Sequence, residues 1–330
     1  MTQIRVCMIG CGGFAQLCHG PSQRRIAAAD PAVELVACCD TDPSRAQAYA
    51  RAFGFTHFYT DSLAMLGAEK PDAVIAAVPP PVTCGAVVPL LERGFRVLLE
   101  KPPGLTTAEL ERLIAAAAAG GAQVQVAFNR RRMPVLIKAR EILDAEFALA
   151  SVGRLDYEMI RCNRWDEDFS TTAIHALDAA LFLARSPVLD AEFRFQDQKH
   201  GGRLTANAVM NAICVSGLPI QVTIQPVTGR NAESARLSSV GRTLILKIPA
   251  SPVPEERAAL ELWRDNVRVE AFVDQARDTG ERFGVLGETE DFLHAVRSGG
   301  AFTPNLQECR QPVALMEAMR LRRSGPIRFT

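Results

Sequence analysis

The hydrophobic positions in the first part of the chain form short runs with few polar residues. These runs are IRVCMIG, ELVACCD, DAVIAAV, FRVLLE and AQVQVAF, and helical patterns separate them. Nearly continuous apolar runs are typical of parallel strands that helices cover on both faces. The alternation of strand and helix therefore predicts an α/β Rossmann domain, with a doubly wound parallel sheet, over residues 1–127.

The pattern changes beyond residue 128. We expect a helix over 134–146, a strand over 152–162 and a helix over 170–184. From residue 204 to about residue 273, apolar and polar residues alternate in runs that turn signals separate, which indicates an antiparallel sheet. Two helical patterns close the chain. Residues 128–330 are therefore predicted to form an α+β domain with a large, mainly antiparallel sheet.

Length and charge narrow the range of partners. The chain has 330 residues, of which 48% are hydrophobic, and this is enough to bury two cores. Lys plus Arg and Asp plus Glu number 37 each, so no basic field attracts nucleic acid or anionic lipid. The start MTQIRVCMIG lacks the features of a secretion signal, and no apolar run approaches the roughly 20 residues that span a bilayer. We expect a cytoplasmic protein that binds neither nucleic acid nor membrane.

Cysteine and histidine spacing gives no sign of a metal centre. The nine cysteines are odd in number and include no CxxC pair, and the five histidines include no HxH or HxxxH pair. Free cysteines within strands behave as small core residues. We therefore expect reduced thiols and no bound metal.

The first predicted strand runs directly into a glycine-rich turn, Gly10-Cys11-Gly12-Gly13-Phe14-Ala15. In this G-x-G-x-x-A sequence, Gly10 permits a tight turn, Gly12 lets the backbone approach a pyrophosphate, and Ala15 lets the next helix pack closely on the sheet. The N-terminus of that helix offers free N–H groups to an anion. An ordinary turn between a strand and a helix is the alternative, but the position in the first βαβ unit favours a dinucleotide site that includes Gly13 and Phe14.

Asp40 closes the second predicted strand, where the adenosine ribose of a dinucleotide should lie. A carboxylate there accepts hydrogen bonds from ribose hydroxyls and repels a 2′-phosphate, which favours NAD. NADP is not excluded, because Thr41, Ser44 and Arg45 are near enough in sequence to hold a phosphate. Asp40 as a simple turn residue before Asp42-Pro43 is the alternative.

Several motifs together resemble the glucose-fructose oxidoreductase, inositol dehydrogenase and rhizopine catabolism (Gfo/Idh/MocA) family. They are GCGGFA, Glu100-Lys101-Pro102 after the fifth run, VAFNRRRMP at 126–134, AIHALDAALFLA, and the closing PNLQECRQPVALMEAMRLRRS. The resemblance runs through the whole chain, and EKP is its most specific part. It implies a nicotinamide-binding Rossmann domain followed by a substrate-binding and oligomerisation domain.

The resemblance implies that Lys101 lies beside the nicotinamide and the reacting oxygen of the substrate. A lysine at the carboxyl ends of the strands can hydrogen-bond that oxygen and stabilise charge during hydride transfer. Glu100 is expected to help hold the cofactor and to orient the lysine, and Pro102 stiffens the chain after it. A surface lysine paired to Glu100 is the alternative.

His175 resembles the family's catalytic histidine, which shares proton transfer with the lysine in polyol dehydrogenases. Asp178 lies on the same helix face and is expected to orient the ring or bind substrate. The alternative is a structural pair at the start of a helix. The sugar and inositol dehydrogenases of the family carry aspartate four residues before the histidine, but this chain has Thr171 there. A hydroxyl cannot hold negative charge as a carboxylate does, so the family triad does not transfer whole.

Two further groups complete the expected site. Pro79, after the fourth run, is expected to shape the cofactor pocket, although Thr83 replaces the histidine that the family often has. Polar residues cluster before Thr171 and at the domain junction, where arginines can bind a carboxylate or phosphate and an indole can stack on a sugar ring. A solvated loop is the alternative for each of them. The members expected to bind substrate are Asn129, Arg161, Arg164 and Trp165.

These features predict an NAD(P)-dependent oxidoreductase that transfers hydride to or from a sugar, polyol or related carbonyl compound, with Lys101 and His175 as the acid and base. An enzyme that uses NAD for elimination or glycoside cleavage without net redox is one alternative. A sensor that binds dinucleotide without catalysis is another. The family pairs its second domains through the sheet, so we expect a homodimer or homotetramer.

Overall fold

The computed structural model describes residues 3–148, 151–166, 168–250, 257–276 and 278–329. The chain divides into two compact units. The first unit contains residues 1–132 and 278–313, and the second contains residues 133–277 and 314–330. Residues 278–313 thus pack with the first unit, although sequence order assigned them to the second domain.

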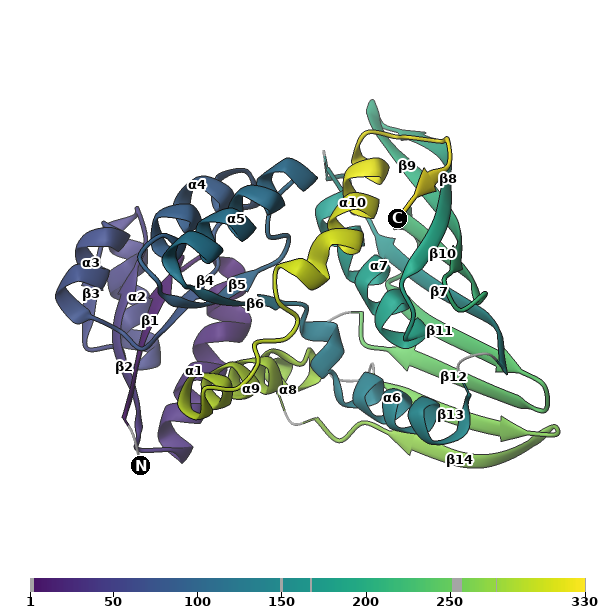
Figure 1. The fold of residues 1–330 in the computed structure, drawn as a ribbon, viewed down its shortest axis with the longest axis horizontal. Coiled ribbons are helices and arrows are strands. Elements are labelled where there is room, and N and C mark those ends of the chain that lie inside the picture. The colour runs from purple at the N-terminus through teal and green to yellow at the C-terminus, as the bar shows by residue number, and fades with distance from the viewer. Residues whose placement is uncertain (1–2, 149–150, 167, 251–256, 277, 330) are drawn as a thin grey trace. The chain divides into compact units, whose positions relative to one another are not determined.

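The first unit contains a parallel sheet of six strands in the order β3-β2-β1-β4-β5-β6 (Figure 1). The reversal of order between β1 and β4 is the arrangement of a Rossmann fold, and it confirms the predicted α/β class. The three residues of β3 were not predicted as a strand, because HFY at a sheet edge is too short to show a pattern. The strands are β1 (Ile4–Ile9), β2 (Val33–Cys39), β3 (His57–Tyr59), β4 (Ala73–Ala76), β5 (Arg96–Glu100) and β6 (Gln123–Ala127).

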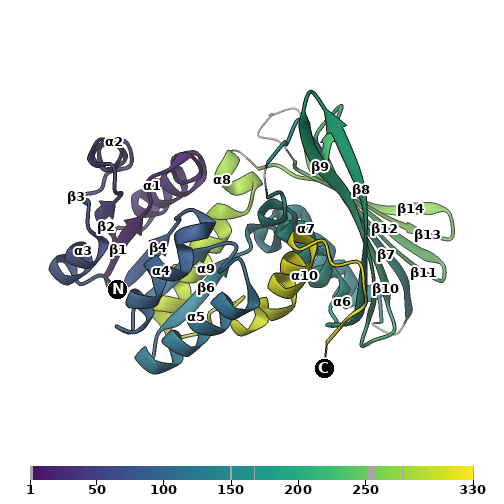
Figure 2. The same cartoon turned by 90° about the horizontal axis from the view of Figure 1, so that it is seen from above.

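Helices lie on both faces of this sheet (Figure 2). They include α1 (Gly20–Ala29), α2 (Pro43–Phe53), α3 (Ser62–Glu69), α4 (Pro80–Leu91), α5 (Thr107–Gly120), α8 (Thr279–Arg282) and α9 (Val285–Ser298), with short helices η1 (Ala15–His19), η2 (Asn129–Arg132) and η4 (Gln307–Cys309). The Asp42 carboxylate accepts the N–H groups of Ser44 and Arg45 at the start of α2. Thr106 caps α5 in the same way. Caps of this kind each stabilise a helix by about 1 kcal/mol.

Helix α9 joins the first unit through its apolar face. Leu286, Phe292 and Leu293 belong to the same buried cluster as Ile4 and Met8 of β1. Each such side chain contributes about 1.5–3 kcal/mol when it leaves water, so this face decides where the helix packs. The sequence shows an amphipathic helix but does not show which sheet it covers.

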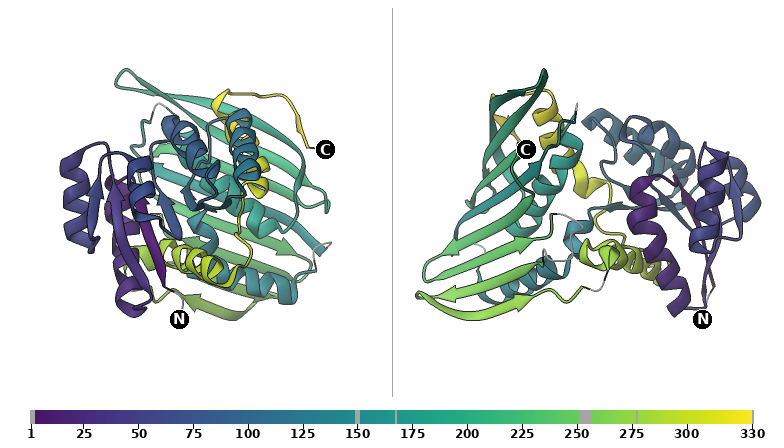
Figure 3. Two further views of the ribbon diagram at one scale, coloured as in Figure 1. Left: turned by 60° about the vertical axis from the view of Figure 1, so that its left-hand side comes forward. Right: turned by 180° about the vertical axis from the view of Figure 1, so that it is seen from behind.

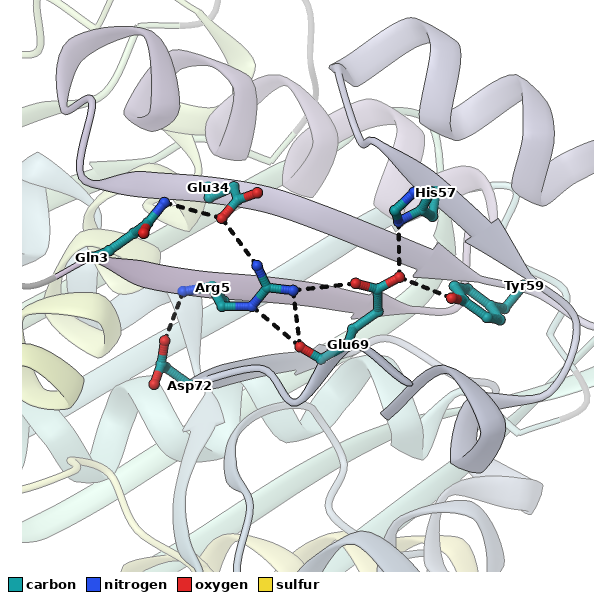
Figure 4. Close-up of polar contacts among 7 residues, drawn as sticks. All are labelled: Gln3, Arg5, Glu34, His57, Tyr59, Glu69 and Asp72. Atoms are coloured by element: carbon teal, nitrogen blue, oxygen red, sulfur yellow. Dashed lines mark hydrogen bonds and ion pairs between the residues drawn. The ribbon is translucent and has the colours of Figure 1, made fainter. Parts of the chain in front are cut away.

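A network of charged and polar side chains joins the first residues of β1 and β2 to β3 and α3 (Figure 4). The guanidinium of Arg5 donates to Glu34 at 3.2 Å, to the backbone oxygen of Glu69 at 2.9 and 3.1 Å, and to its carboxylate at 3.2 Å. Glu69 Oε1 also lies 2.8 Å from Tyr59 Oη and 2.8 Å from His57 Nδ1. We call this set the Arg5–Glu69 network; its members are Gln3, Arg5, Glu34, His57, Tyr59, Glu69 and Asp72.

The second unit contains a sheet whose nine described strands follow the order β14-β13-β12-β11-β7-β10-β9-β8-β15. Neighbouring strands are antiparallel except β7 and β10, which confirms the prediction of a mainly antiparallel sheet. Its strands are β7 (Val152–Cys162), β8 (Val188–His200), β9 (Arg203–Cys214), β10 (Pro219–Thr228), β11 (Ala232–Ser239), β12 (Arg242–Ile248), β13 (Ala259–Arg264), β14 (Val267–Val273) and β15 (Ile327–Arg328). Strand β8 was not predicted, because its second half carries mostly polar residues.

Two helices cover one face of the second sheet (Figure 3). Helix α7 (Ser170–Ala184) packs against β7 and β10, and α6 (Pro134–Glu146) packs against β12 and β13. Both helices have the bounds that the sequence predicted. Helix α10 (Arg310–Arg320) begins in the first unit and ends in the second. Among the described residues, no helix has both the length and the apolar character needed to cross a membrane.

Candidate functional site

The glycine-rich turn follows β1 and is tight on one side and open on the other. Gly10 has a φ of +89°, and a Cβ added to it would lie 2.1 Å from the carbonyl oxygen of Ala77. At Gly12 and Gly13 an added Cβ would meet no described atom within 4 Å. Phe14, which precedes η1, provides no side-chain cap in the described structure. The open backbone and the uncapped N–H groups fit the pyrophosphate of a dinucleotide.

The helix after this turn starts with a π-helical segment, η1, and continues as α1. Ala15 at its start is 1% exposed, which agrees with close packing on the sheet. His19 at its end is fully buried. A π-turn contains one more residue than an α-turn and is frequent at functional sites.

Asp40, immediately after β2, is connected to the glycine-rich turn. Its Oδ2 accepts the N–H of Cys11 at 2.8 Å, and its Oδ1 accepts the N–H of Asp42 at 3.0 Å. Arg45 lies 3.6 Å from both Asp40 and Asp42, so its charge is shared between two carboxylates. Thr41 is exposed beside them. Each carboxylate oxygen has two lone pairs, so Asp40 keeps acceptor capacity for a hydroxyl group.

Pro79 precedes α4 and is exposed, close in sequence to the Ala77 carbonyl that packs on Gly10. Its carbonyl oxygen accepts a hydrogen bond from Thr83 Oγ1 at 3.2 Å. Thr83, which replaces the expected histidine, is 2% exposed. In the structure, the Thr83 hydroxyl therefore binds the backbone at the start of α4.

Lys101 follows β5, whose residues Val97, Leu98 and Leu99 are fully buried. The lysine itself is partly exposed. Glu100 Oε2 accepts the backbone N–H of Lys101 at 3.2 Å, and Glu100 Oε1 lies 2.8 Å from His19 Nε2. Glu100 therefore connects the helix after the glycine-rich turn to the backbone of the lysine.

Asn129, in η2, was expected to bind substrate. It is 5% exposed, and its Nδ2 donates to the carbonyl oxygen of Phe283 at 2.8 Å, close to the start of α9. Its amide group therefore holds two segments of the first unit together.

In the second unit, His175 and Asp178 both lie on α7 and are buried, at 9% and 1% exposed. Thr171 Oγ1 donates to the carbonyl oxygen of Asp168 at 3.2 Å, in the first turn of the same helix. His175 belongs to the second unit and Lys101 to the first.

The polar residues before α7 contact different partners. Arg164 donates to Asp166 at 2.6 Å and to Thr172 at 3.2 Å, and Trp165 stacks on His200 with ring centroids 6.3 Å apart. Arg161 is different, because its 6% exposed side chain forms a buried ion pair with Glu233. Its guanidinium also donates to the carbonyl oxygens of Ile160 and Ala232, and contact between Arg161 and substrate stays a prediction.

Two buried groups near Lys101 were not found from the sequence. One is His19, the partner of Glu100. The other is Glu288 in α9, whose pKa is raised well above 4.5, first by burial and then by the charge of Glu100. The same surroundings raise the pKa of Cys18 to about 12, mainly by burial. A lone histidine in a helix and a glutamate in the first turn of another give no sequence signal for this arrangement.

Residues 4–128 match the sequence model of an oxidoreductase family with an NAD-binding Rossmann fold, Gfo/Idh/MocA. The chain is 32% identical over 189 residues to D-apiose dehydrogenase of Paraburkholderia graminis, covering 53% of this chain and 48% of that protein. It is 25% identical over 235 residues to inositol 2-dehydrogenase 1 of Saccharopolyspora erythraea, covering 66% and 68%. The matches thus span about half or less of most of the first curated relatives.

The fold has solved counterparts over the full length. A Gfo/Idh/MocA family oxidoreductase from Vibrio cholerae aligns with a TM-score of 0.78 and 21% identity, covering 97% of this chain and 98% of that one. The family match in the first unit and the shared fold of the whole chain agree with the motifs at Gly10 and Glu100. Residues 4–128 thus match the Gfo/Idh/MocA family of oxidoreductases, and the whole chain shares its fold with a solved member of that family.

Proposed function

We propose that the protein is a nicotinamide-dependent oxidoreductase that acts on a sugar, a polyol or a related carbonyl compound. The observation that carries this proposal is the link, within one unit, from the glycine-rich turn through His19 and Glu100 to Lys101. The related D-apiose and inositol dehydrogenases support a hydroxylated small molecule as substrate. When bound, the nicotinamide ring supplies the hydride acceptor or donor.

NAD is the preferred cofactor in this proposal. The Asp40 carboxylate is placed to accept the ribose hydroxyls and to repel a 2′-phosphate. Arg45 is a cation beside this site, but Asp40 and Asp42 already share its charge. A phosphate would have to compete with two carboxylates for one guanidinium, which weakens the case for NADP.

Lys101 and His175 are proposed to manage the proton on the reacting oxygen. In the oxidation direction, the substrate hydroxyl gives its proton to one of these groups while the carbon gives up hydride. In the reduction direction, the same group returns a proton to the oxygen as hydride arrives. The Lys101 ammonium also stabilises negative charge on that oxygen. Asp178 is proposed to orient the His175 ring.

Substrate recognition is proposed to involve the start of α7. Thr171 and Arg164 present a hydroxyl and a guanidinium there, and Trp165 presents an aromatic ring. These groups suit a hydroxylated or acidic substrate. Thr171 in place of the family aspartate removes a negative charge, so reduction of a ketone, aldehyde or imine is as compatible as alcohol oxidation.

We also propose that the second sheet mediates a homodimer or homotetramer. Helices α6 and α7 cover one face, while side chains of opposite strand parity to the buried ones include exposed apolar residues, for example Ile213 at 44% and Ile245 at 40%. Light scattering at micromolar concentration tests this proposal. A dimer or tetramer is expected, and a monomer contradicts it.

A cofactor-reduction screen tests the proposed reaction. The purified protein is mixed with NAD or NADP, separately, and with panels of sugars, polyols, sugar acids and nucleotide sugars. Stoichiometric formation of NADH with at least one compound is expected. Product formation with no net change in cofactor absorbance would instead identify elimination or glycoside cleavage. NADH binding without any turnover in either direction would favour a sensor.

A further inference from the structure

The Glu100 carboxylate, whose side chain is 11% exposed, joins two segments that the proposed reaction needs. Glu100 Oε1 lies 2.8 Å from Nε2 of His19, the last residue of η1. Glu100 Oε2 accepts the backbone N–H of Lys101 at 3.2 Å. Because η1 starts at Ala15, immediately after the glycine-rich turn, only two hydrogen bonds separate the helix at the cofactor turn from the lysine backbone.

The His19 ring is held entirely inside the first unit. It is fully buried, and the ring of Phe14 packs edge-on against it at 5.5 Å between centroids. A carboxylate only accepts hydrogen bonds, so Nε2 is the nitrogen that donates to Glu100. In the described structure the other ring nitrogen, Nδ1, has no hydrogen-bond partner. An unsatisfied buried polar atom costs about 1–3 kcal/mol, so its presence beside a proposed catalytic lysine calls for a functional reason.

The acidic groups near Glu100 do not compete with it for the His19 ring. Glu288 is buried, its Oε1 has no partner among the described residues, and its pKa is raised well above 4.5, first by burial and then by the charge of Glu100. Cys18 is a neutral thiol for the same physical reason. Glu100 is therefore the carboxylate that the buried imidazole serves. The other charged groups acting on this pocket come from η2, α8 and α9; they are Arg132, Asp278 and Asp291.

We propose that His19 is a positioning residue that fixes the backbone of Lys101 through the Glu100 carboxylate. The inference rests on the proposed function, because it assumes that the lysine acts on substrate. With His19 in place, both carboxylate oxygens are used and Glu100 has one orientation. Without the imidazole, the carboxylate rotates toward other donors and releases the Lys101 N–H. The lysine then loses alignment with the reacting oxygen, and misplacement of a catalytic group by about 1 Å can cost about 100-fold in rate.

The test follows the backbone amide of Lys101 directly. Protein labelled with ¹⁵N-lysine gives amide signals from Lys101 and from the other lysines of the sequence, Lys70, Lys138, Lys199 and Lys247. Hydrogen exchange of each amide is compared in wild type, His19→Leu and His19→Gln. His57→Gln is the matched control, because His57 also lies 2.8 Å from a glutamate oxygen but belongs to the Arg5–Glu69 network.

We expect His19→Leu to accelerate exchange of the Lys101 amide by about tenfold or more, with the other lysine amides unchanged. His19→Gln should stay within about threefold of wild type, because its amide nitrogen replaces the Nε2 donor. His57→Gln should leave the Lys101 amide unchanged. If His19→Leu does not fold, Glu100→Gln serves instead, since an amide side chain has a single acceptor oxygen for the two N–H donors.

Kinetics separate positioning from a general effect on the fold. With a substrate from the screen, His19→Leu should lower kcat about tenfold or more and leave the KM for NAD within about twofold. His19→Gln should recover most of the lost kcat. Unchanged Lys101 exchange in folded His19→Leu protein, or faster exchange at all lysines alike, would overturn the inference. If Lys101→Ala retains full turnover while His19→Leu still releases the amide, the connection stands and the proposed catalytic role of Lys101 fails.

Discussion

Two regions of the first unit each contain a histidine that lies 2.8 Å from a glutamate oxygen, but their surroundings differ. In the Arg5–Glu69 network, the Glu69 carboxylate accepts hydrogen bonds from Arg5, Tyr59 and His57, and the His57 side chain is 57% exposed. At the end of β5, His19 is fully buried and keeps one nitrogen without a partner in the described structure. The first histidine is exposed and its glutamate has several partners, whereas the second is buried and has one nitrogen without a partner among the described residues.

This difference separates stability from function. A satisfied, partly exposed network contributes modestly to folding, because water competes for each charge. A buried polar atom without a partner destabilises the fold, so we interpret the one at His19 as serving the proposed reaction. The family resemblance and the physical arrangement therefore point to the same edge of the sheet, where Lys101 and the glycine-rich turn lie.

The largest expected effect is on turnover when the lysine is removed. Lys101→Ala should lower kcat by about 10²–10⁴-fold, because the oxygen of the substrate loses its proton partner. NADH affinity, measured by fluorescence titration, should stay within about threefold. Lys70→Ala, at the exposed end of α3, is the control and should leave kcat unchanged. Full activity in Lys101→Ala would contradict the claim that the region around Lys101 takes part in catalysis.

Substitutions at Gly10 and Gly12 should separate an effect on folding from an effect on cofactor binding. Gly10→Ala should destabilise the protein by more than about 3 kcal/mol, because its Cβ would meet the Ala77 carbonyl oxygen. Gly12→Ala should leave the melting temperature within about 1 °C and weaken NADH binding by about tenfold or more, because its Cβ fills the open side of the turn. The measurements are thermal unfolding and NADH titration. Unchanged NADH affinity in Gly12→Ala would contradict the assignment of the turn.

A smaller, pH-dependent effect is expected at Glu288. Its pKa is raised in the folded protein above the ordinary value of 4.5, so the folded state retains a proton that the unfolded state releases. The free energy of unfolding therefore falls as pH rises from 4.5 toward the raised value. Glu288→Gln removes this loss and should raise the melting temperature by about 2–4 °C at pH 8 and by much less near pH 4.5. An equal shift at both pH values would contradict a raised pKa at Glu288.

The smallest effect is expected in the exposed pair. His57→Gln should cost less than about 1 kcal/mol of folding free energy, because solvent screens His57 and Glu69 keeps its bonds to Arg5 and Tyr59. Neither kcat nor NADH affinity should change. Chemical denaturation with wild type as reference measures the first quantity. A loss of NADH affinity would show that the two regions are not independent.

Strong local patterns made much of the fold predictable. The bounds of α6, β7 and α7 follow from apolar periodicity and from clear starts and stops, and the caps at Asp42 and Thr106 act as expected. The three-residue β3 and the polar half of β8 escape such patterns. Helix α9 shows its apolar face in the sequence, but only tertiary packing determines that this face covers the parallel sheet.

The sequence predicted those candidate site residues that directly follow a predicted strand. Gly10, Asp40 and Lys101 stand where motif spacing puts them. His19 could not be found, because a π-helical turn shifts the register of its helix and a single histidine carries no pattern. Glu288 resembles an ordinary acid in the first turn of a helix, and its burial depends on contacts with distant segments. The buried ion pair of Arg161 with Glu233 could not be predicted either, because its partner lies on a strand distant in sequence.

A crystal structure of the protein with NADH tests the central claim most directly. We expect the pyrophosphate over Gly12 and Gly13, the adenosine ribose hydroxyls on Asp40, and the nicotinamide ring within contact distance of the Lys101 side chain. A dinucleotide bound elsewhere, or one whose ring lies away from Lys101 while Glu100 still holds His19, would contradict it.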